Sequence, residues 1–297
     1  MNLRDFSLLF VVCFLWGLNV VLTRWVIADM SVPPIFYAAL RFGLIALLLI
    51  PFLRPVPKKI GQLFLIAMGI GAAHFAFLFL GLQTAEASAA AVATQLGVPF
   101  STLLSMVFLG EKIGWRRGMG ITLAFAGVMV IAFEPSGFAV SVGLLYVVLS
   151  TFVGACAGIL MKRIDPMPAM QMQAWVGLFS VGPLALISLA VEQGQVSEFI
   201  AAGWGVWVAT AFAVLAVSIF GHGSFYMLLK RYDVTVISPL TLMTPIWSVA
   251  LGVALLSEAL TVRLVVGTAI ALIGVGAIAM RPNVKLPVAA LGRKLFQ

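Results

Sequence analysis

The sequence predicts an all-α integral membrane protein of ten transmembrane helices, arranged as two inverted five-helix repeats with both chain termini in the cytoplasm. Of the 297 residues, 63% are hydrophobic and 9% are charged, whereas a soluble domain carries about 25% charged residues. The apolar residues form continuous runs of roughly 18–25, the length that a helix needs to cross the hydrocarbon of a bilayer. A membrane-spanning barrel would instead show segments of about ten residues with alternating polarity.

Ten apolar runs follow one another along the chain. They cover residues 6–27, 35–53, 61–82, 86–109, 116–133, 138–161, 170–191, 204–228, 235–256 and 262–280. Turn-forming residues separate them, most clearly Asp29–Pro34 after the first run, Pro55–Lys59 after the second and Glu134–Gly137 after the fifth. The first run is too long for a signal peptide and no small-residue cleavage site follows it, so we expect it to remain as a span.

The distribution of Lys and Arg predicts the orientation, because basic residues are retained on the cytoplasmic side of a membrane. With the N-terminus inside, fifteen basic residues fall in cytoplasmic segments, two (Arg24 and Arg263) fall in outer loops, and Arg41 lies within the second span. An odd number of spans would scramble this bias. The cytoplasmic set is Arg4, Arg54, Lys58, Lys59, Lys112, Arg116, Arg117, Lys162, Arg163, Lys230, Arg231, Arg281, Lys285, Arg293 and Lys294. Residues 283–297 form a basic tail, whose end, Leu291–Gln297, resembles a protease-site scar and is set apart from the fold.

The two halves of the chain resemble each other. Residues 77–135 placed on 224–282 without gaps give roughly 14 identities in 59 positions. Glu111 then falls on Glu258 and Arg116 on Arg263, and the other telling matches are Gly120 on Gly267, Gly127 on Gly274 and Pro135 on Pro282. We therefore expect a first repeat over residues 1–135 and a second over 136–282. Because five spans is an odd number, the second repeat enters the membrane upside down, as the inner Arg116 and outer Arg263 require.

Several function classes are disfavoured. The formal net charge of +8 does not indicate nucleic-acid binding, because the basic residues lie in short gaps between apolar runs and not in one stripe. The sequence lacks the Gly-x-x-x-x-Gly-Lys-Ser/Thr loop of an ATP-driven pump, and no Asp or Glu lies mid-span to suggest an intramembrane protease. Cys13 and Cys156 lie inside apolar runs and suit packing better than a disulfide or a metal site. Neither an enzyme nor a cofactor is predicted.

Four short motifs resemble those of the drug/metabolite transporter superfamily: Trp16-Gly17-Leu18-Asn19, Leu40-Arg41-Phe42, Leu109-Gly110-Glu111-Lys112 and Ser257-Glu258-Ala259-Leu260. The resemblance covers essentially the whole chain. It is closest to the EamA-domain, ten-helix exporters, which include the YddG-type aromatic amino-acid exporters. One departure lies in the sixth span, where Gly154–Gly158 replaces the Trp16-Gly17 pair of the first span, so a site role for Trp16 is not duplicated.

This resemblance implies a multi-pass secondary transporter of a bacterial inner membrane that works by alternating access. It would export amino acids, with hydrophobic or aromatic ones favoured, or related metabolites. Spans one to four and six to nine would line the cavity, with substrate near the midplane between the repeats. Export of another small metabolite or drug-like compound is the alternative, and an oligomeric channel is the alternative of a different class. The expected partners are a small-molecule substrate and the lipid bilayer. The oligomeric state, the coupling to protons and the direction of flux stay open, and a monomer is compatible with the sequence.

Polar and kinked positions inside the spans are the candidates for the substrate site, because polar side chains are costly in hydrocarbon. His74 and His222 fall one position apart in the repeat and either line the cavity, carry a coupling proton or bond as neutral groups. Pro99 and Pro245 are also one position apart and expose helix carbonyls. The residues expected to line the cavity are Trp16, Asn19, His74, Phe77, Gln95, Pro99, Trp175, His222, Tyr226, Thr241, Pro245 and Ser248.

Each candidate also has a structural interpretation. Asn19 can tie the first span to a neighbour, and the hydroxyls of Thr241 and Ser248 can bond to carbonyls of their own helix. Arg41 is expected to brace the bundle, with attraction of a substrate carboxylate as the second interpretation. Glu111 and Glu258 are predicted to stabilise helix ends. The glycines spaced by seven residues in spans five and ten are expected to be close-packing sites.

Overall fold

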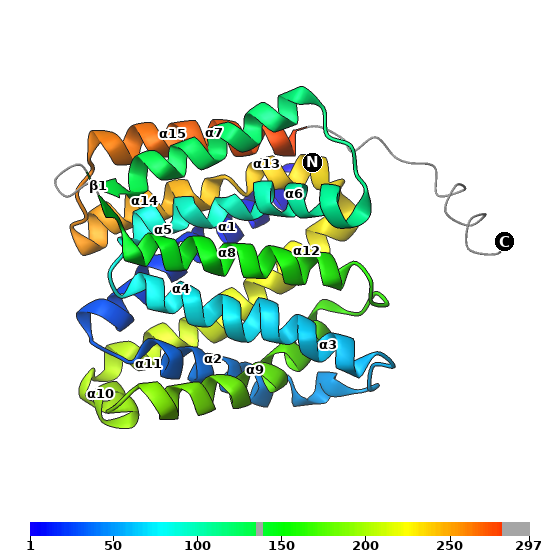
Figure 1. Cartoon of the computed structure of the whole chain (residues 1–297). Helices are drawn as coiled ribbons and strands as arrows, with labels where there is room; N and C mark the ends of the chain where they lie inside the picture. The colour runs from blue at the N-terminus through cyan, green and yellow to red at the C-terminus, as the bar shows by residue number, and fades with distance from the viewer. Residues whose placement is uncertain (135–138, 281–297) are drawn as a thin grey trace.

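The computed structural model describes residues 1–134 and 139–280, which form a bundle of helices running along a common axis (Figure 1). Eight helical segments are long and apolar enough to cross a membrane. They are Leu3–Asp29, Ile60–Leu82, Ala87–Leu109, Val142–Met161, Ala169–Val191, Trp204–Arg231, Val236–Leu256 and Val262–Ala279. The other two predicted spans coincide with α2 (Pro34–Leu48), which is 15 residues long, and α7 (Trp115–Ala132), whose first turn carries Arg116 and Arg117. The predicted boundaries at Pro135–Gly137 and beyond Met280 lie outside the described residues.

Several spans change helix type along their length. The first is α1 (Leu3–Arg24) continued by the π-helical η1 (Trp25–Asp29), and the third is α3 (Ile60–Ala67), η3 (Met68–Ala73) and α4 (His74–Leu82). The remaining elements in chain order are η2 (Ile50–Leu53), α5 (Ala87–Ala93), η4 (Thr94–Leu96), α6 (Gly97–Leu109), β1 (Phe133–Glu134), β2 (Ala139–Val140), α8 (Val142–Met161), α9 (Ala169–Val191), α10 (Gln195–Ala201), α11 (Trp204–Ala211), η5 (Phe212–Gly221), α12 (His222–Arg231), α13 (Val234–Leu240), α14 (Met243–Leu256) and α15 (Val262–Ala279). β1 and β2 form a two-residue antiparallel pair.

The bundle has two distinct ends. We call one the basic end: it contains the start of α1 and the connections 54–59, 110–114, 162–168 and 231–233, and it lies to the right in Figure 1. The other, which we call the far end, contains α10, the strand pair and the start of α5. Of the fifteen basic residues predicted on one side, the eleven that the structure describes all belong to the basic end, whereas Arg24 and Arg263 belong to the far end. The strong charge asymmetry of the sequence is therefore an asymmetry of the folded bundle.

Apolar and aromatic side chains cover the outside of the bundle. Leu186 and Leu189 on α9 are 69% and 74% exposed, as lipid-facing residues are expected to be. Trp115 at the basic end of α7 is 70% exposed and Trp204 at the far end of α11 is 80% exposed. Exposed tryptophans at opposite ends match the aromatic residues that anchor membrane proteins at the two interfaces.

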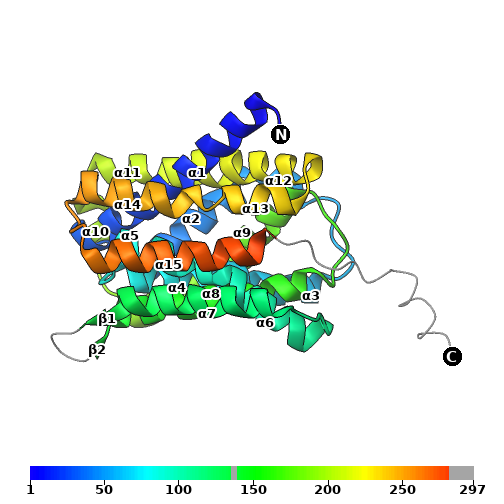
Figure 2. The same cartoon turned by 90° about the horizontal axis from the view of Figure 1, so that it is seen from above.

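The last helices of the two predicted repeats, α7 and α15, pack against each other through glycine (Figures 1 and 2). A Cβ added to Gly120 would lie 2.8 Å from the Gly274 carbonyl oxygen, and one added to Gly267 would lie 2.7 Å from that of Gly127. Each contact thus joins a glycine nearer the N-terminus of one helix to a glycine nearer the C-terminus of the other, so the helices are antiparallel. The close-packing role predicted for these glycines agrees with this geometry.

Local geometry recurs at repeat-related positions. α6 ends at Gly110 with φ +66°, and α14 ends at the corresponding Ser257 with φ +55°. The two longest π-helical segments, η3 and η5, each end immediately before one of the two histidines, His74 and His222. Short π segments inside α-helices are rare and occur often at functional sites, so both histidines lie at places where the regular helix ladder is interrupted.

Candidate functional site

A pocket of about 670 Å³ opens at the basic end. Its walls are the end of α8, the connection 162–168, the start of α9 and one face of α12. Tyr226 is the one predicted site residue that lines it. Its apolar lining includes five methionines, Met161, Met167, Met170, Met172 and Met227. Methionine side chains are flexible and polarizable, so this lining can adapt to ligands of different shape.

The eighth span leads inward from this pocket. Tyr226, His222 and Ser218 are spaced by four residues and therefore follow one face of α12 and η5. The His222 ring lies 5.3 Å from the Trp16 ring of α1, and Trp16 also contacts Phe225 at 5.0 Å. The indole Nε1 of Trp16 and the side-chain Oδ1 of Asn19, one turn further along α1, are buried without a hydrogen-bond partner among the described residues. The structure thus brings Trp16 and His222 together between α1 and the junction of η5 with α12, with Asn19 one turn further along α1.

His74 lies against a different helix. Its Nδ1 is 2.9 Å from both the carbonyl oxygen and the hydroxyl of Ser150 on α8. Gly154, one turn along α8, permits this approach, because a Cβ there would lie 3.0 Å from His74 Nδ1. The asymmetry noted in the sequence therefore has a structural counterpart: an indole covers His222, whereas a glycine faces His74.

The two histidines share one hydrogen-bond pattern. His222 Nδ1 lies 3.0 Å from the carbonyl oxygen of Val217, five residues earlier in the π-helical segment. A carbonyl oxygen only accepts hydrogen bonds, so both contacts are hydrogen bonds in the tautomer that carries the proton on Nδ1. Nε2 is then the nitrogen left to accept a hydrogen bond or a proton.

The remaining predicted site residues are dispersed. Phe77 stacks on Tyr146 at 6.3 Å, on a face where Tyr146 is 38% exposed. Trp175 packs on Phe179 at 5.2 Å, and Phe179 in turn contacts Phe64 of α3. Among the described residues, the ring contacts of Phe77 and Trp175 are with these side chains and not with Trp16 or His222.

The helix breaks of the fourth and ninth spans lie just before the two prolines. Pro99 is the third residue of α6, after η4, and Pro245 is the third residue of α14, after a turn at Thr241. Gln95 lies within the break at η4. The Thr241 hydroxyl donates to the Ser238 carbonyl of its own segment at 2.8 Å, as expected of a hydroxyl that stabilises its own helix and does not bind substrate. Ser248 instead donates to the Gly17 carbonyl at 3.2 Å and ties α14 to α1.

Arg41 is the most unusual buried polar group, and it was not included among the predicted cavity residues. It is 2% exposed, its Nη2 donates to the Ser218 hydroxyl at 3.1 Å, and its guanidinium carbon lies 5.2 Å from the centre of the Phe75 ring. Ser218 is itself held by Gln173, whose Nε2 donates to the Ser218 carbonyl at 2.6 Å. The sequence signal for Arg41 is a charged residue inside an apolar span. Its neighbours Ser218 and Phe75, and Gln173 behind Ser218, come from distant segments of the chain, so the sequence does not reveal them.

At the far end, two glutamates of the second half bind helix starts of the first half. Glu258 accepts hydrogen bonds from the backbone N–H groups of Ala87 and Ser88, at 2.5 and 3.0 Å, and from the Ser88 hydroxyl. Glu192 accepts from the N–H groups of Ile35 and Phe36, both at 2.8 Å. Carboxylates are favourable at helix N-termini because they satisfy free N–H groups and complement the helix dipole.

A second carboxylate lies close to Glu258. Burial, and then the Glu258 charge, raise the pKa of Glu86, while Arg24 acts in the opposite direction. Arg24 also donates to the Ala85 carbonyl at 3.0 Å, so it supports the same turn. Lowering the pH would therefore reduce the repulsion between Glu86 and Glu258 at this end of the bundle.

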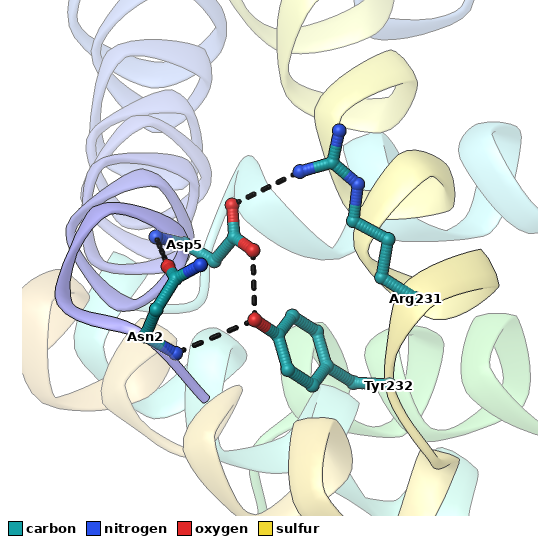
Figure 3. Close-up of polar contacts among 4 residues, drawn as sticks. All are labelled: Asn2, Asp5, Arg231 and Tyr232. Atoms are coloured by element: carbon teal, nitrogen blue, oxygen red, sulfur yellow. Dashed lines mark hydrogen bonds and ion pairs between the residues drawn. The ribbon is translucent and has the colours of Figure 1, made fainter.

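At the basic end, a small cluster of polar side chains connects two helices, as Figure 3 shows. Asp5 of α1 is 4% exposed, pairs with Arg231 at 3.2 Å and accepts a hydrogen bond from the Tyr232 hydroxyl at 2.8 Å. Asn2 caps α1 by accepting from the Asp5 N–H at 2.8 Å, and its own N–H donates to Tyr232. This cluster ties the start of α1 to the end of α12, beside the open pocket.

Comparisons with known proteins agree on the kind of molecule. A family model described as "EamA-like transporter family" matches residues 5–133 and 139–280. A Salmonella typhimurium protein described as "Probable amino-acid metabolite efflux pump" is 28% identical over 92% of this chain and 94% of its own. An Escherichia coli protein of the same description is 28% identical over 88% and 90%. A solved structure described only as "Crystal structure of protein" covers 100% of both chains with a TM-score of 0.61 at 18% identity, a likeness of fold alone.

Proposed function

The chain belongs to the EamA-like transporter family, and on that basis we propose that it is an alternating-access secondary transporter that exports amino acids, or closely related metabolites, across a bacterial inner membrane. Family and relatives establish a multi-pass membrane transporter related to metabolite efflux pumps. The substrate class, the ten-span topology with cytoplasmic termini and the site residues are part of the proposal.

The proposal assigns residues 1–135 and 136–282 to two repeats of opposite orientation. The family model matches twice, once within each of these ranges. The antiparallel pairing of α7 with α15 supports an inverted relation, because these helices occupy equivalent places in the two repeats. Positive φ at both Gly110 and Ser257 supports it independently. Inverted repeats let one sequence adopt two conformations in which the repeats exchange their arrangements about a pseudo-two-fold axis in the membrane plane, which is the basis of alternating access.

The observation that carries the proposal is the unequal closure of the two ends. At the far end, Glu258 of the second repeat binds the start of α5 in the first. Its repeat counterpart Glu111, at the basic end, makes no side-chain hydrogen bond or ion pair with the described residues. The 670 Å³ pocket opens at that same basic end. Glu258 and Glu111 are equivalent in the repeat, and only Glu258 is bound to a helix start among the described residues. This is the arrangement expected of a carrier that is in one of two exchangeable states.

If the basic end faces the cytoplasm, as basic residues do, the structure is an inward-open state ready to load a substrate for export. In the second state, Glu111 would bind the start of α13, whose residues Val234 and Thr235 correspond to Ala87 and Ser88 in the repeat. The far end would then open. Exchange of these two contacts is the proposed conformational cycle.

Transport by purified protein tests the function. Proteoliposomes preloaded with an unlabelled amino acid should accumulate the same labelled amino acid by counterflow, with phenylalanine and leucine as first substrates. Counterflow needs a binding site that alternates between the two sides, so a channel would not produce it. If no amino acid moves faster than in protein-free liposomes while another metabolite does, the amino-acid assignment fails and the exporter assignment stays.

Proton coupling through His74 and His222 is the finer part of the proposal. Each ring keeps Nε2 available while Nδ1 donates to a carbonyl, which suits proton exchange during the cycle. An imposed pH gradient should then accelerate uptake in wild-type proteoliposomes, and the acceleration should disappear in His74→Gln or His222→Gln. An unchanged rate with and without the gradient would leave facilitated diffusion as the mechanism.

A further inference from the structure

The guanidinium of Arg41 lies inside the bundle with most of its hydrogen-bonding capacity unused. Nη2 donates to Ser218, but Nε and both hydrogens of Nη1 have no acceptor within the part of the chain that the structure describes. The ion pairs among the described residues join other groups, so no carboxylate neutralises this cation. A buried charge without a partner is strongly unfavourable, and more so between helices in a membrane.

A purely structural arginine would use its donors differently. To brace α2 against its neighbours, it would bond to backbone carbonyls freed by the π-helical segment. Instead, the Ser218 hydroxyl takes one N–H, and the Phe75 ring lies 5.2 Å from the guanidinium carbon. Gln173 fixes Ser218 in turn through the serine carbonyl at 2.6 Å. These contacts hold the guanidinium in position while leaving Nε and Nη1 free, which is how a binding group is prepared for a ligand.

From these contacts we propose that Arg41 binds the carboxylate of the transported substrate in an occluded site between α2, α4 and η5. Arginine presents N–H donors in a plane that matches a carboxylate, and charge-assisted hydrogen bonds of this kind are about twice as strong as neutral ones. The inference rests on the proposed transport function and names the chemical group that its substrate must carry. Arg41 is then a substrate-binding residue and not only a brace.

The pocket at the basic end supplies the route to this site. Tyr226 lines the pocket, His222 follows one turn inward and Ser218, the partner of Arg41, follows after another turn. At about 1.5 Å per residue, Ser218 lies on the order of 12 Å beyond Tyr226. Met170 and Gly223 line this pocket next to His222, and the Met170 Cε lies 2.7 Å from where a Cβ on Gly223 would be. A methionine side chain is flexible enough to move aside for a ligand.

The surrounding unsatisfied groups fit the rest of an amino acid. Asn19 Oδ1 is a buried acceptor without a donor among the described residues, and it suits a substrate ammonium group. α1 and the eighth span run in opposite directions, so Asn19, one turn beyond Trp16, is at the level of the turn before His222. Trp16 and Phe225 form the adjoining aromatic wall. Donors for a carboxylate, an acceptor for an ammonium and an apolar wall match a zwitterion with an apolar side chain.

Ligand-induced thermal stabilisation in detergent tests this site without relying on transport. The probes are L-phenylalanine, phenylacetate, which lacks the ammonium, and phenethylamine, which lacks the carboxylate. We expect the two carboxylates to raise the Tm of the wild-type protein and phenethylamine to have little effect. In Arg41→Gln, the apparent affinity for both carboxylates should fall by roughly tenfold or more. Arg163→Gln, an exposed change at the basic end, should bind as the wild type does.

The outcomes separate this inference from the proposed function. If Arg41→Gln binds carboxylates as tightly as the wild type, or if no carboxylate stabilises the wild type, the inference is wrong. Counterflow of an amine, retained in Arg41→Gln, would then leave the exporter assignment standing. If Arg41→Gln does not fold, Arg41→Lys and Ser218→Ala take its place. Both keep the positive charge but disturb its geometry, and both should weaken carboxylate binding more than amine binding.

Discussion

Glu258 accepts a hydrogen bond from the backbone N–H of Ser88 at 3.0 Å and another from the Ser88 hydroxyl. These bonds place a carboxylate of the second repeat on the first turn of a helix in the first repeat. The equivalent pair at the opposite end is Glu111 and Thr235. In the proposed cycle, the two pairs form alternately, so the predictions below concentrate on the contacts that close one end of the bundle.

Removing the charge of Glu258 should destabilise the closed far end. Glu258→Gln keeps the size of the side chain but weakens three hydrogen bonds to α5, and we expect a loss of about 1–2 kcal/mol in the free energy of unfolding. Denaturant titration in mixed micelles measures this. Glu111→Gln is the matched control and should change stability by less than about 0.5 kcal/mol. Equal losses in both variants would show that the two ends are not in different states.

Glycine contacts between α7 and α15 should tolerate no side chain. A Cβ at Gly127 would meet the backbone of α15, whereas one at Gly118, on the same helix, would have no neighbour within 4 Å among the residues that the structure describes. We expect Gly127→Ala to cost about 1–3 kcal/mol through overpacking. Gly118→Ala should be neutral or slightly stabilising, since alanine favours the helix more than glycine does. The same denaturant titration compares them, and a Gly127→Ala protein as stable as Gly118→Ala would refute the close packing.

The approach of His74 to α8 depends on Gly154. Gly154→Ala puts a Cβ 3.0 Å from Nδ1 and should displace the ring from Ser150. We expect slower counterflow and a weaker response to a pH gradient. Gly158→Ala, one turn along α8, meets no atom of the described residues within 4 Å and should behave as the wild type. Normal transport and pH response in Gly154→Ala would show that the His74–Ser150 contact has no role in the cycle.

Protonation of Glu86 should stabilise the far end. Because burial and the Glu258 charge raise its pKa, the folded protein binds this proton more tightly than the unfolded chain does. The stabilisation is full below the ordinary glutamate pKa of about 4.3 and is lost as the pH rises through the raised value. Glu86→Gln should therefore be more stable than the wild type at pH 7, with a smaller difference at pH 5. Glu198→Gln, at the same end, is the control, and a difference that does not change with pH would argue against this assignment.

Much of the architecture follows from patterns that one sequence contains. The length of the apolar runs predicts the spans, and the offset that places Glu111 on Glu258 also pairs the glycines that are predicted to be close-packing sites. These features are regular along the chain, so they can be detected without tertiary information. That the glycines meet each other, between α7 and α15, is visible only in the structure. The helix-end role predicted for Glu258 also agrees with the structure, but the sequence did not show which helix it stabilises.

The candidate site was less accessible to prediction. Phe77 and Trp175 are predicted cavity walls, and the sequence does not show that their ring contacts are with Tyr146 and Phe179. The π-helical segments before His74 and His222 have no periodic signature. The sequence predicts a bracing role for Arg41, because its unsatisfied donors become visible only once its neighbours are in place.

Alternating access predicts that one end of the bundle opens when the other closes. The most direct test measures the distance between spin labels at each end in the same preparation. In a background without Cys13 and Cys156, spin labels at Gln83 and Ala259 report on the far end. Labels at their repeat counterparts, Lys230 and Lys112, report on the basic end. Double electron–electron resonance in lipid should show a short far-end distance and a long basic-end distance, and Glu258→Gln with substrate should lengthen the first while shortening the second. Distances that stay fixed, or that lengthen together at both ends, would contradict alternating access.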